Sequence, residues 1–232
     1  MNINDYDKFI TYLYTLSDDA YLTFNKKIVN TPSKMIGIRA PLIKEISKNI
    51  YKNDPYCFLD KVRNNYYEED LLEGLVISKI KEPILFDKYL ERFIPKINNW
   101  AVCDMCISSM KQMKKDEKYF LLAKKYIHSD KEFIIRAGYI IIMDHFLDNK
   151  HIDEILNILN KEKESQYYYV NMAKAWLISV CYVKFKEKTL VFLLNNNLDT
   201  FTYNKAIQKI IESNRINISD KEYLKQLKRK IT

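Results

Sequence analysis

The sequence predicts an all-α protein, and three observations lead to this fold class. Apolar residues recur at intervals of three and four along almost the whole chain, the spacing that places them on one face of a helix. The 232 residues include only three glycines and five prolines, whereas a β-rich fold usually needs more of both in its turns. Hydrophobic residues make up 47% of the chain, which is enough to bury a sizeable core.

Each predicted helix has its own apolar stripe or start signal. Pro41 and the pair Asp54-Pro55 mark two starts, because proline is tolerated in the first turn of a helix. Acidic residues from Glu68 onward complement the positive end of another helix dipole. The predicted helices cover residues 6–16, 21–28, 41–46, 54–62, 68–80, 83–94, 99–113, 116–127, 131–147, 152–159, 168–185, 186–194, 201–213 and 219–230.

One of these segments could be misread as a strand, because residues 134–142 are rich in isoleucine. Its length and the charges near both ends favour a buried helix. Helix starts recur about every fifteen residues, so pairs recur about every thirty to forty, which is the rhythm of HEAT-type repeats. We therefore predict an α-solenoid of HEAT-like antiparallel helix pairs, about fourteen helices in a single repeat domain over residues 1–232. A compact multi-helix bundle is the alternative.

The charge balance favours a polyanionic partner. Lys and Arg number 38 against 30 Asp and Glu, which gives a net charge of +8. Several basic clusters fall at helix corners, and in a solenoid such corners line up along one edge, where they could follow phosphates. For any single cluster, a solvated surface is the ordinary explanation.

The predicted environment is the cytoplasm. The first five residues are polar and acidic, unlike a signal peptide, and no run of eighteen uncharged apolar residues predicts a membrane span. The four cysteines lack the spacing of a secreted disulfide framework.

Most familiar catalytic and metal-binding patterns are missing from the sequence. Cys103 and Cys106 have a Cys-x-x-Cys spacing, but they lie in a helical run, so we expect buried helical cysteines and no metal site. The three histidines form no ligand pattern, and no phosphate-binding glycine loop or nucleophile elbow is present. We expect no metal and no cofactor.

The only two tryptophans carry the strongest chemical signal. Trp100 and Asp104 are four residues apart, so an indole and a carboxylate share one helix face. Trp176 lies in another apolar helical run. Asp104 and Arg136 both interrupt apolar stretches, and a charge there needs a partner or a water-filled groove. The two could pair structurally, or they could line a functional groove.

Several runs in order and spacing resemble the AlkD-like DNA alkylation repair glycosylases, over nearly the whole chain. These runs are residues 37–41, 69–75, 99–104, Arg136 before an apolar helix, 173–176 and 202–209. The resemblance implies a curved HEAT-like solenoid with double-stranded DNA in a basic concave face. It also implies hydrolysis of the N-glycosidic bond of cationic alkylated purines, N3-alkyladenine and N7-alkylguanine, without base flipping.

The resemblance also assigns roles to residues. Asp104 matches the catalytic carboxylate, and Trp100 and Trp176 match the aromatic pair that flanks the lesion. Arg136 matches an arginine that contacts the DNA backbone, and Lys174 and Lys205, from the two late runs, are further expected DNA-binding residues. The expected protein is a monomeric, nucleoid-associated hydrolase. A non-catalytic DNA-binding protein and a protein-interaction scaffold are the alternatives.

Overall fold

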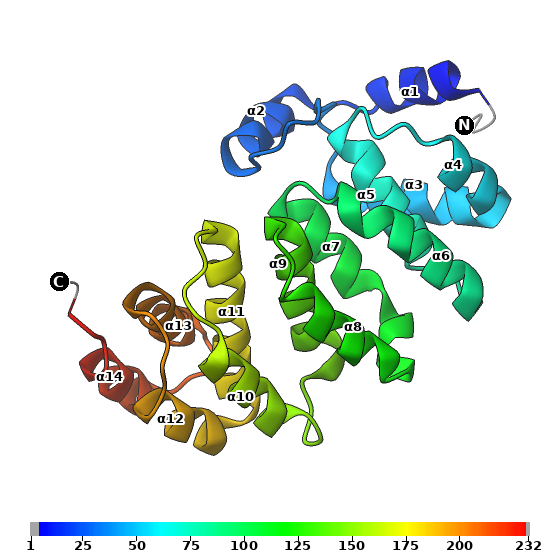
Figure 1. Cartoon of the computed structure of the whole chain (residues 1–232). Coiled ribbons are helices and arrows are strands. Elements are labelled where there is room, and N and C mark those ends of the chain that lie inside the picture. The colour runs from blue at the N-terminus through cyan, green and yellow to red at the C-terminus, as the bar shows by residue number, and fades with distance from the viewer. Residues whose placement is uncertain (1–4, 231–232) are drawn as a thin grey trace. The chain divides into compact units, whose positions relative to one another are not determined.

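The computed structural model describes residues 5–230 and is helical throughout them, apart from loops and one isolated β-bridge between Lys34 and Tyr66. Fourteen α-helices lie within these residues (Figure 1). The chain divides into two compact units, Met1–Asp116 (unit 1) and Glu117–Thr232 (unit 2), and each is described by itself. The all-α fold is confirmed; a single domain over residues 1–232 stays a prediction.

Unit 1 contains seven of the described α-helices and two short 3₁₀ turns. They are α1 (Tyr6–Tyr14), α2 (Asp19–Ile28), α3 (Ala40–Asn53), α4 (Pro55–Lys61), α5 (Tyr67–Ile77), α6 (Pro83–Phe93), η1 (Ile94–Lys96), α7 (Trp100–Ser109) and η2 (Lys111–Lys115). Helix α5 packs against both α3 and α7, and its neighbours in the chain, α4 and α6, also pack on it. Alternate helices thus stack on one another, as they do in a solenoid of helical pairs.

Unit 2 repeats this arrangement. Its helices are α8 (Lys118–Tyr126), α9 (Glu132–Ile141), the π-helical turn η3 (Ile142–Phe146), α10 (Ile152–Lys161), α11 (Tyr168–Lys184), α12 (Lys186–Leu194), α13 (Thr200–Glu212) and α14 (Ile218–Gln226). Helix α11 packs between α9 and α13, and α10 packs against α12. Stacking of alternate helices in both units fits the predicted α-solenoid. The predicted curvature and basic concave face stay predictions.

Two predicted helices change geometry before their expected ends. The predicted helix 99–113 is α7 followed by the separate turn η2, and the predicted helix 131–147 changes to π geometry after Ile141. The isoleucine-rich run is nevertheless helical and buried, as predicted.

Helices α5 and α7 approach each other very closely at Gly74. A Cβ atom at this position would collide with the Cys106 side chain and the Phe93 ring. Every residue of α5 is buried, so it is the central helix of unit 1. Gly74 therefore sets how closely α7 can approach the core of unit 1.

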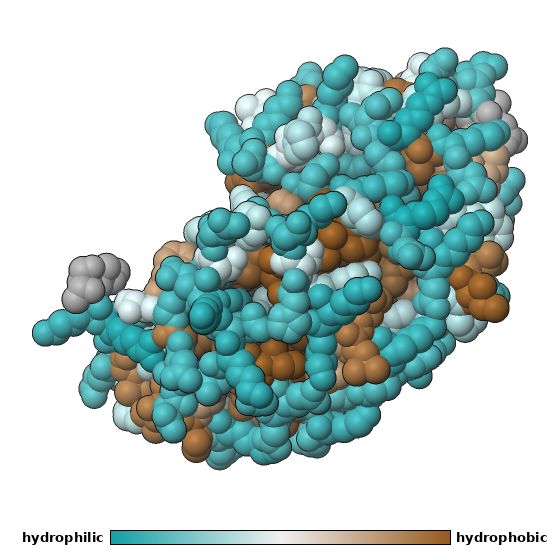
Figure 2. Space-filling view, viewed as in Figure 1, coloured by the Kyte–Doolittle hydropathy of each residue, from teal (hydrophilic) through white to brown (hydrophobic). Residues whose placement is uncertain are grey.

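The surface is mainly hydrophilic, with apolar patches such as the brown area near α12 (Figure 2). Val191 and Leu194 of that helix are exposed. Several predicted basic clusters are partly neutralised, since Lys124, Lys186 and Lys188 pair with nearby carboxylates. Within residues 5–230, no helix is both long and apolar enough to cross a membrane.

Candidate nucleic-acid site

The candidate site of unit 1 is the partly exposed face of α7. Trp100, Asp104 and Ser108 recur at intervals of four and are half-buried, whereas Val102, Cys103, Cys106 and Ile107 point into the core. The sequence prediction that Trp100 and Asp104 share a helix face is therefore confirmed. Asp104 lies at the boundary between the core and solvent, where a carboxylate can act on a ligand without complete desolvation.

Trp100 is fixed by its ring nitrogen. The Nε1–H group donates to the backbone oxygen of Ile28 at 3.1 Å. Ile28 is the last residue of α2, where backbone carbonyls lack partners within the helix. The indole thus satisfies one of these carbonyls, and this bond limits rotation of the ring about its side-chain torsions.

The start of α7 is fixed by Asn99, which is fully buried. Its side-chain oxygen accepts from the Val102 backbone N–H at 2.9 Å, so Asn99 is the N-cap of the helix. Its amide donates to Asn98 at 2.8 Å, and Asn98 in turn donates to Ser33 at 3.2 Å. The residue before the candidate site is thereby linked to a polar network inside unit 1.

Four acidic residues of α5 form the centre of that network: Glu68, Glu69, Asp70 and Glu73, all buried. Asp70 accepts from Ser33 at 3.1 Å and from Asn64 at 3.0 Å. Glu73 accepts from Asn64 at 2.6 Å and pairs with Lys96 at 2.7 Å. Burial, opposed by these hydrogen bonds, raises the pKa of Asp70 to about 7.

Glu68 holds the loop between α2 and α3, and Glu69 holds the loop between α4 and α5. The Glu68 carboxylate accepts from the backbone N–H groups of Ile36, Gly37 and Ile38 at 2.8–3.3 Å, and Gly37 has a φ of 97°, which favours glycine. The sequence interpretation of these acids as helix-dipole partners is incomplete. The four acids within six residues were visible in the sequence, but their burial depends on which loops fold back onto α5.

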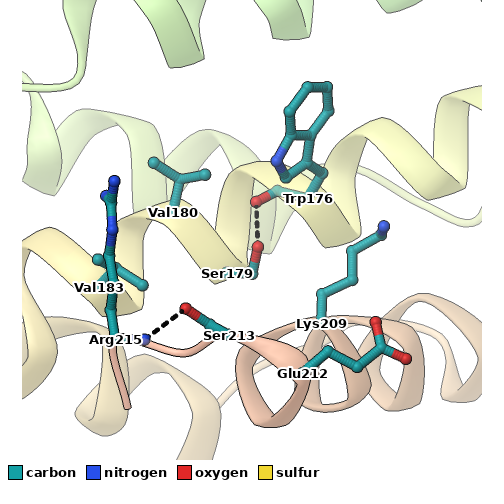
Figure 3. A pocket seen from close by; sticks show the side chains of 8 residues that line it. All are labelled: Trp176, Ser179, Val180, Val183, Lys209, Glu212, Ser213 and Arg215. Carbon is teal, nitrogen blue, oxygen red and sulfur yellow. Dashed lines mark hydrogen bonds between the residues drawn. The ribbon is translucent and has the colours of Figure 1, made fainter.

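A separate candidate site lies in unit 2, around Trp176 of α11. Trp176 is half-buried and borders an open hollow of about 300 Å³ between α11 and the end of α13 (Figure 3). Its other lining residues are Ser179, Val180, Val183, Lys209, Glu212, Ser213 and Arg215. Trp176, Val180 and Val183 recur at helical spacing, so one face of α11 forms this wall.

The three predicted DNA-binding residues also belong to unit 2, but two of them are buried. Arg136 is 5% exposed and donates from Nη1 to the Tyr169 backbone oxygen at 2.7 Å. Lys174 is 2% exposed and donates to the Lys163 backbone oxygen at 2.6 Å. Either side chain would have to leave its carbonyl to reach a phosphate, so their DNA contacts stay predictions.

Burial lowers the pKa of Lys174, although nearby Glu162, Asp199 and Glu164 oppose the shift. Lys205 is half-buried, and its amine donates to Gln208 at 3.3 Å. It is thus the most accessible of the three predicted DNA-binding cations. Two further cations, Lys209 and Arg215, were not predicted from the sequence. Their spacing from Trp176 in the chain gives no signal, because only the packing of α13 on α11 brings them together.

Cys103 and Cys106 are fully buried in α7, and neither is in a disulfide, which confirms the prediction of buried helical cysteines. Burial raises the pKa of the Cys106 thiol well above its ordinary value. Cys106 is packed against the core helix α5, with its sulfur 3.7 Å from the Leu71 backbone oxygen. Both cysteines are therefore part of the packing behind the Trp100 and Asp104 face.

The fold and these side chains define an all-helical protein that presents aromatic, acidic and basic groups at the edges of stacked helices. The model of the family described as DNA alkylation repair enzyme matches residues 10–210, so the chain belongs to this family. This match confirms the resemblance seen in the sequence and supports an enzymatic role in DNA repair. No curated protein and no solved structure gives a significant match.

Proposed function

We propose that the protein is a DNA glycosylase that removes cationic alkylated purines from duplex DNA. The observation that carries this proposal is the position of Asp104, half-buried and one helical turn after a tryptophan whose ring is fixed by Ile28. Membership of a DNA alkylation repair family supports alkylated DNA as the substrate. N3-alkyladenine and N7-alkylguanine are the substrates that this chemistry favours.

The reaction needs little from the protein because the base is already positively charged. Cleavage of the C1′–N bond transfers the bonding electrons to the alkylated base, which leaves as a neutral molecule without an added proton. The sugar becomes oxocarbenium-like, and a water molecule then adds to C1′ and loses a proton. A carboxylate near the sugar stabilises the positive charge and can orient the water.

Each residue has a role in this proposal. Asp104 is the catalytic carboxylate, and Trp100 and Trp176 contact the sugar and the cationic base, with cation–π interactions of roughly 0.5–2 kcal/mol each. Arg136, Lys174 and Lys205 are the proposed backbone contacts. Catalysis without base flipping would differ from the usual glycosylase strategy and would restrict the substrates to bases with weakened bonds. In this proposal the protein is a monomer, and it acts in the cytoplasm on the DNA of the nucleoid.

The test is release of 7-methylguanine from methylated duplex DNA by Asp104→Asn. We expect base release to fall by at least about 100-fold, the scale of losing one transition-state electrostatic contact. Binding to unmethylated duplex should be largely kept. Asp7→Asn is the matched control, since Asp7 is an exposed carboxylate of the same unit and its loss changes the net charge equally.

Two results would decide against the proposal. Base release by Asp104→Asn at the wild-type rate would remove Asp104 from catalysis. Salt-dependent DNA binding by the wild type without release of any methylated base would instead identify a non-catalytic DNA-binding protein.

A further inference from the structure

The hollow beside Trp176 combines features that suit a phosphodiester. It is open to solvent and has an indole at one side and two valines along its wall (Figure 3). Two cations, Lys209 and Arg215, lie on the opposite side, which is formed by α13 and the loop after it. A flat aromatic group, an apolar wall and two positive charges match the sugar, base and phosphate of a nucleotide.

Neither cation is committed to an ion pair within residues 5–230. Among the described residues, Arg215 forms one hydrogen bond, from its backbone N–H to the Ser213 hydroxyl at 3.3 Å, which leaves the guanidinium available. Lys209 has no carboxylate within 4 Å among the described residues. By contrast, Lys186, Lys188 and Lys225 of the same unit are each paired with a carboxylate at 2.6 Å.

One carboxylate borders the hollow and has to be weighed against the two cations. Glu212 is exposed and accepts from the Gln208 side chain at 2.8 Å, within its own helix. In Figure 3 its carboxylate lies beside Lys209 on the side away from Arg215. The lining thus keeps a net positive charge, and the guanidinium can bind two phosphate oxygens at once.

We propose that Trp176, Lys209 and Arg215 form a DNA-backbone binding site that belongs to unit 2 alone. Lys209 and Arg215 each bind a phosphate of the backbone, while Trp176 contacts a sugar or base between them. The proposal rests on the proposed function only for its partner, duplex DNA. Lys209 and Arg215 would join Lys205 as DNA-backbone contacts. Both side chains can reach a phosphate without first breaking a hydrogen bond within the described residues.

The test measures binding of an unmodified duplex by fluorescence anisotropy between 50 and 200 mM salt. Each phosphate contact contributes about 0.9 to the slope of log K against log salt concentration, so Lys209→Gln with Arg215→Gln should reduce the slope by about 2. The control is Lys125→Gln with Lys161→Gln, which removes two exposed charges elsewhere in unit 2. We expect the slope of the control to stay closer to the wild-type slope than that of the Lys209→Gln, Arg215→Gln variant.

A second measurement follows Trp176 directly. In Trp100→Phe, Trp176 is the sole tryptophan, and duplex DNA should quench its fluorescence. The substitutions Lys209→Gln and Arg215→Gln are then added to Trp100→Phe. At a DNA concentration that half-saturates Trp100→Phe alone, they should lower the fraction of Trp176 fluorescence that is quenched. Unchanged melting temperatures of the Lys209→Gln, Arg215→Gln variant and of the Lys125→Gln, Lys161→Gln control would exclude a general loss of folding.

Two outcomes would overturn the proposal: an unchanged slope in the Lys209 and Arg215 variant, or an equal fall in both pairs, which would reflect surface charge in general. These outcomes are distinct from failure of the glycosylase proposal, because the assay needs no damaged base. If Asp104→Asn keeps full base release while the slope still falls by about 2, the backbone site stands and the catalytic assignment fails.

Discussion

The buried carboxylate of Asp70 should make the protein less stable as the pH rises from 5 to 8. Asp70 is 4% exposed, and its pKa is raised from 3.8 to about 7, chiefly by burial. The folded state therefore binds a proton more tightly than the unfolded state. The stability from this group is fully present below pH 3.8 and is lost as the pH passes through about 7.

The size of the effect follows from the shift. A difference of about 3 pKa units corresponds to about 4 kcal/mol over the whole range, at 1.36 kcal/mol per unit. Most of the change falls between pH 5 and 8, where we expect the free energy of unfolding to drop by about 2–3 kcal/mol. Asp70→Asn removes the titrating group, so its stability should depend less on pH by this amount.

The assay is urea unfolding at several pH values, followed by the fluorescence of Trp100 in a Trp176→Phe background. Trp100 belongs to the same unit as Asp70 and is then the sole tryptophan, so the signal reports on unit 1. Other groups also titrate, and the difference between the parent and Asp70→Asn isolates Asp70. A difference that stays flat between pH 5 and 8 would refute the reasoning.

Three further predictions test the support of the candidate site. Gly74→Ala should destabilise unit 1 by about 1–3 kcal/mol in urea unfolding, because its methyl group meets Cys106; Cys106→Ala should recover part of this loss, and additive losses would contradict the packing argument. Lys174→Met should reduce the salt slope of DNA binding by about 1, because Lys174 is a proposed phosphate contact; an unchanged slope would show that Lys174 stays buried against the Lys163 carbonyl. Asn99→Ala should cost about 0.5–2 kcal/mol through loss of the cap bond to Val102, and should slow base release more than Asn99→Ser, which keeps a capping oxygen.

Much of the fold could be predicted from the sequence because helical periodicity is a local signal. All fourteen predicted helices correspond to helices of the structure, and proline at residues 41, 55 and 83 lies at the start of a helix in each case. The errors lie at helix ends, where tertiary contacts decide. The run after Ile141 keeps its apolar pattern yet changes to π geometry, which periodicity of apolar residues does not distinguish from an α-helix.

The candidate site could be predicted only in part. The shared face of Trp100 and Asp104 follows from a spacing of four, a property of any helix. The burial of Arg136 and Lys174 does not, because it depends on the carbonyls of Tyr169 and Lys163, which lie in other segments. A lysine or arginine in a basic protein looks equally available in the sequence whether its side chain is exposed or tied to a backbone oxygen.

The geometry of unit 1 links its stability to its proposed chemistry. A catalytic carboxylate must be held within a fraction of an ångström to favour the transition state over the bound substrate. Asp104 lies on a short helix whose first turn is held by Asn99 and by the Trp100 bond to Ile28, while Gly74 allows its inner face to approach α5. Keeping several carboxylates of α5 away from water is costly, and the cost is offset only while the loops they bind stay in place. Perturbing this buried network should therefore displace Asp104 before it unfolds the protein, so that base release is lost at lower denaturant concentration than the helical signal.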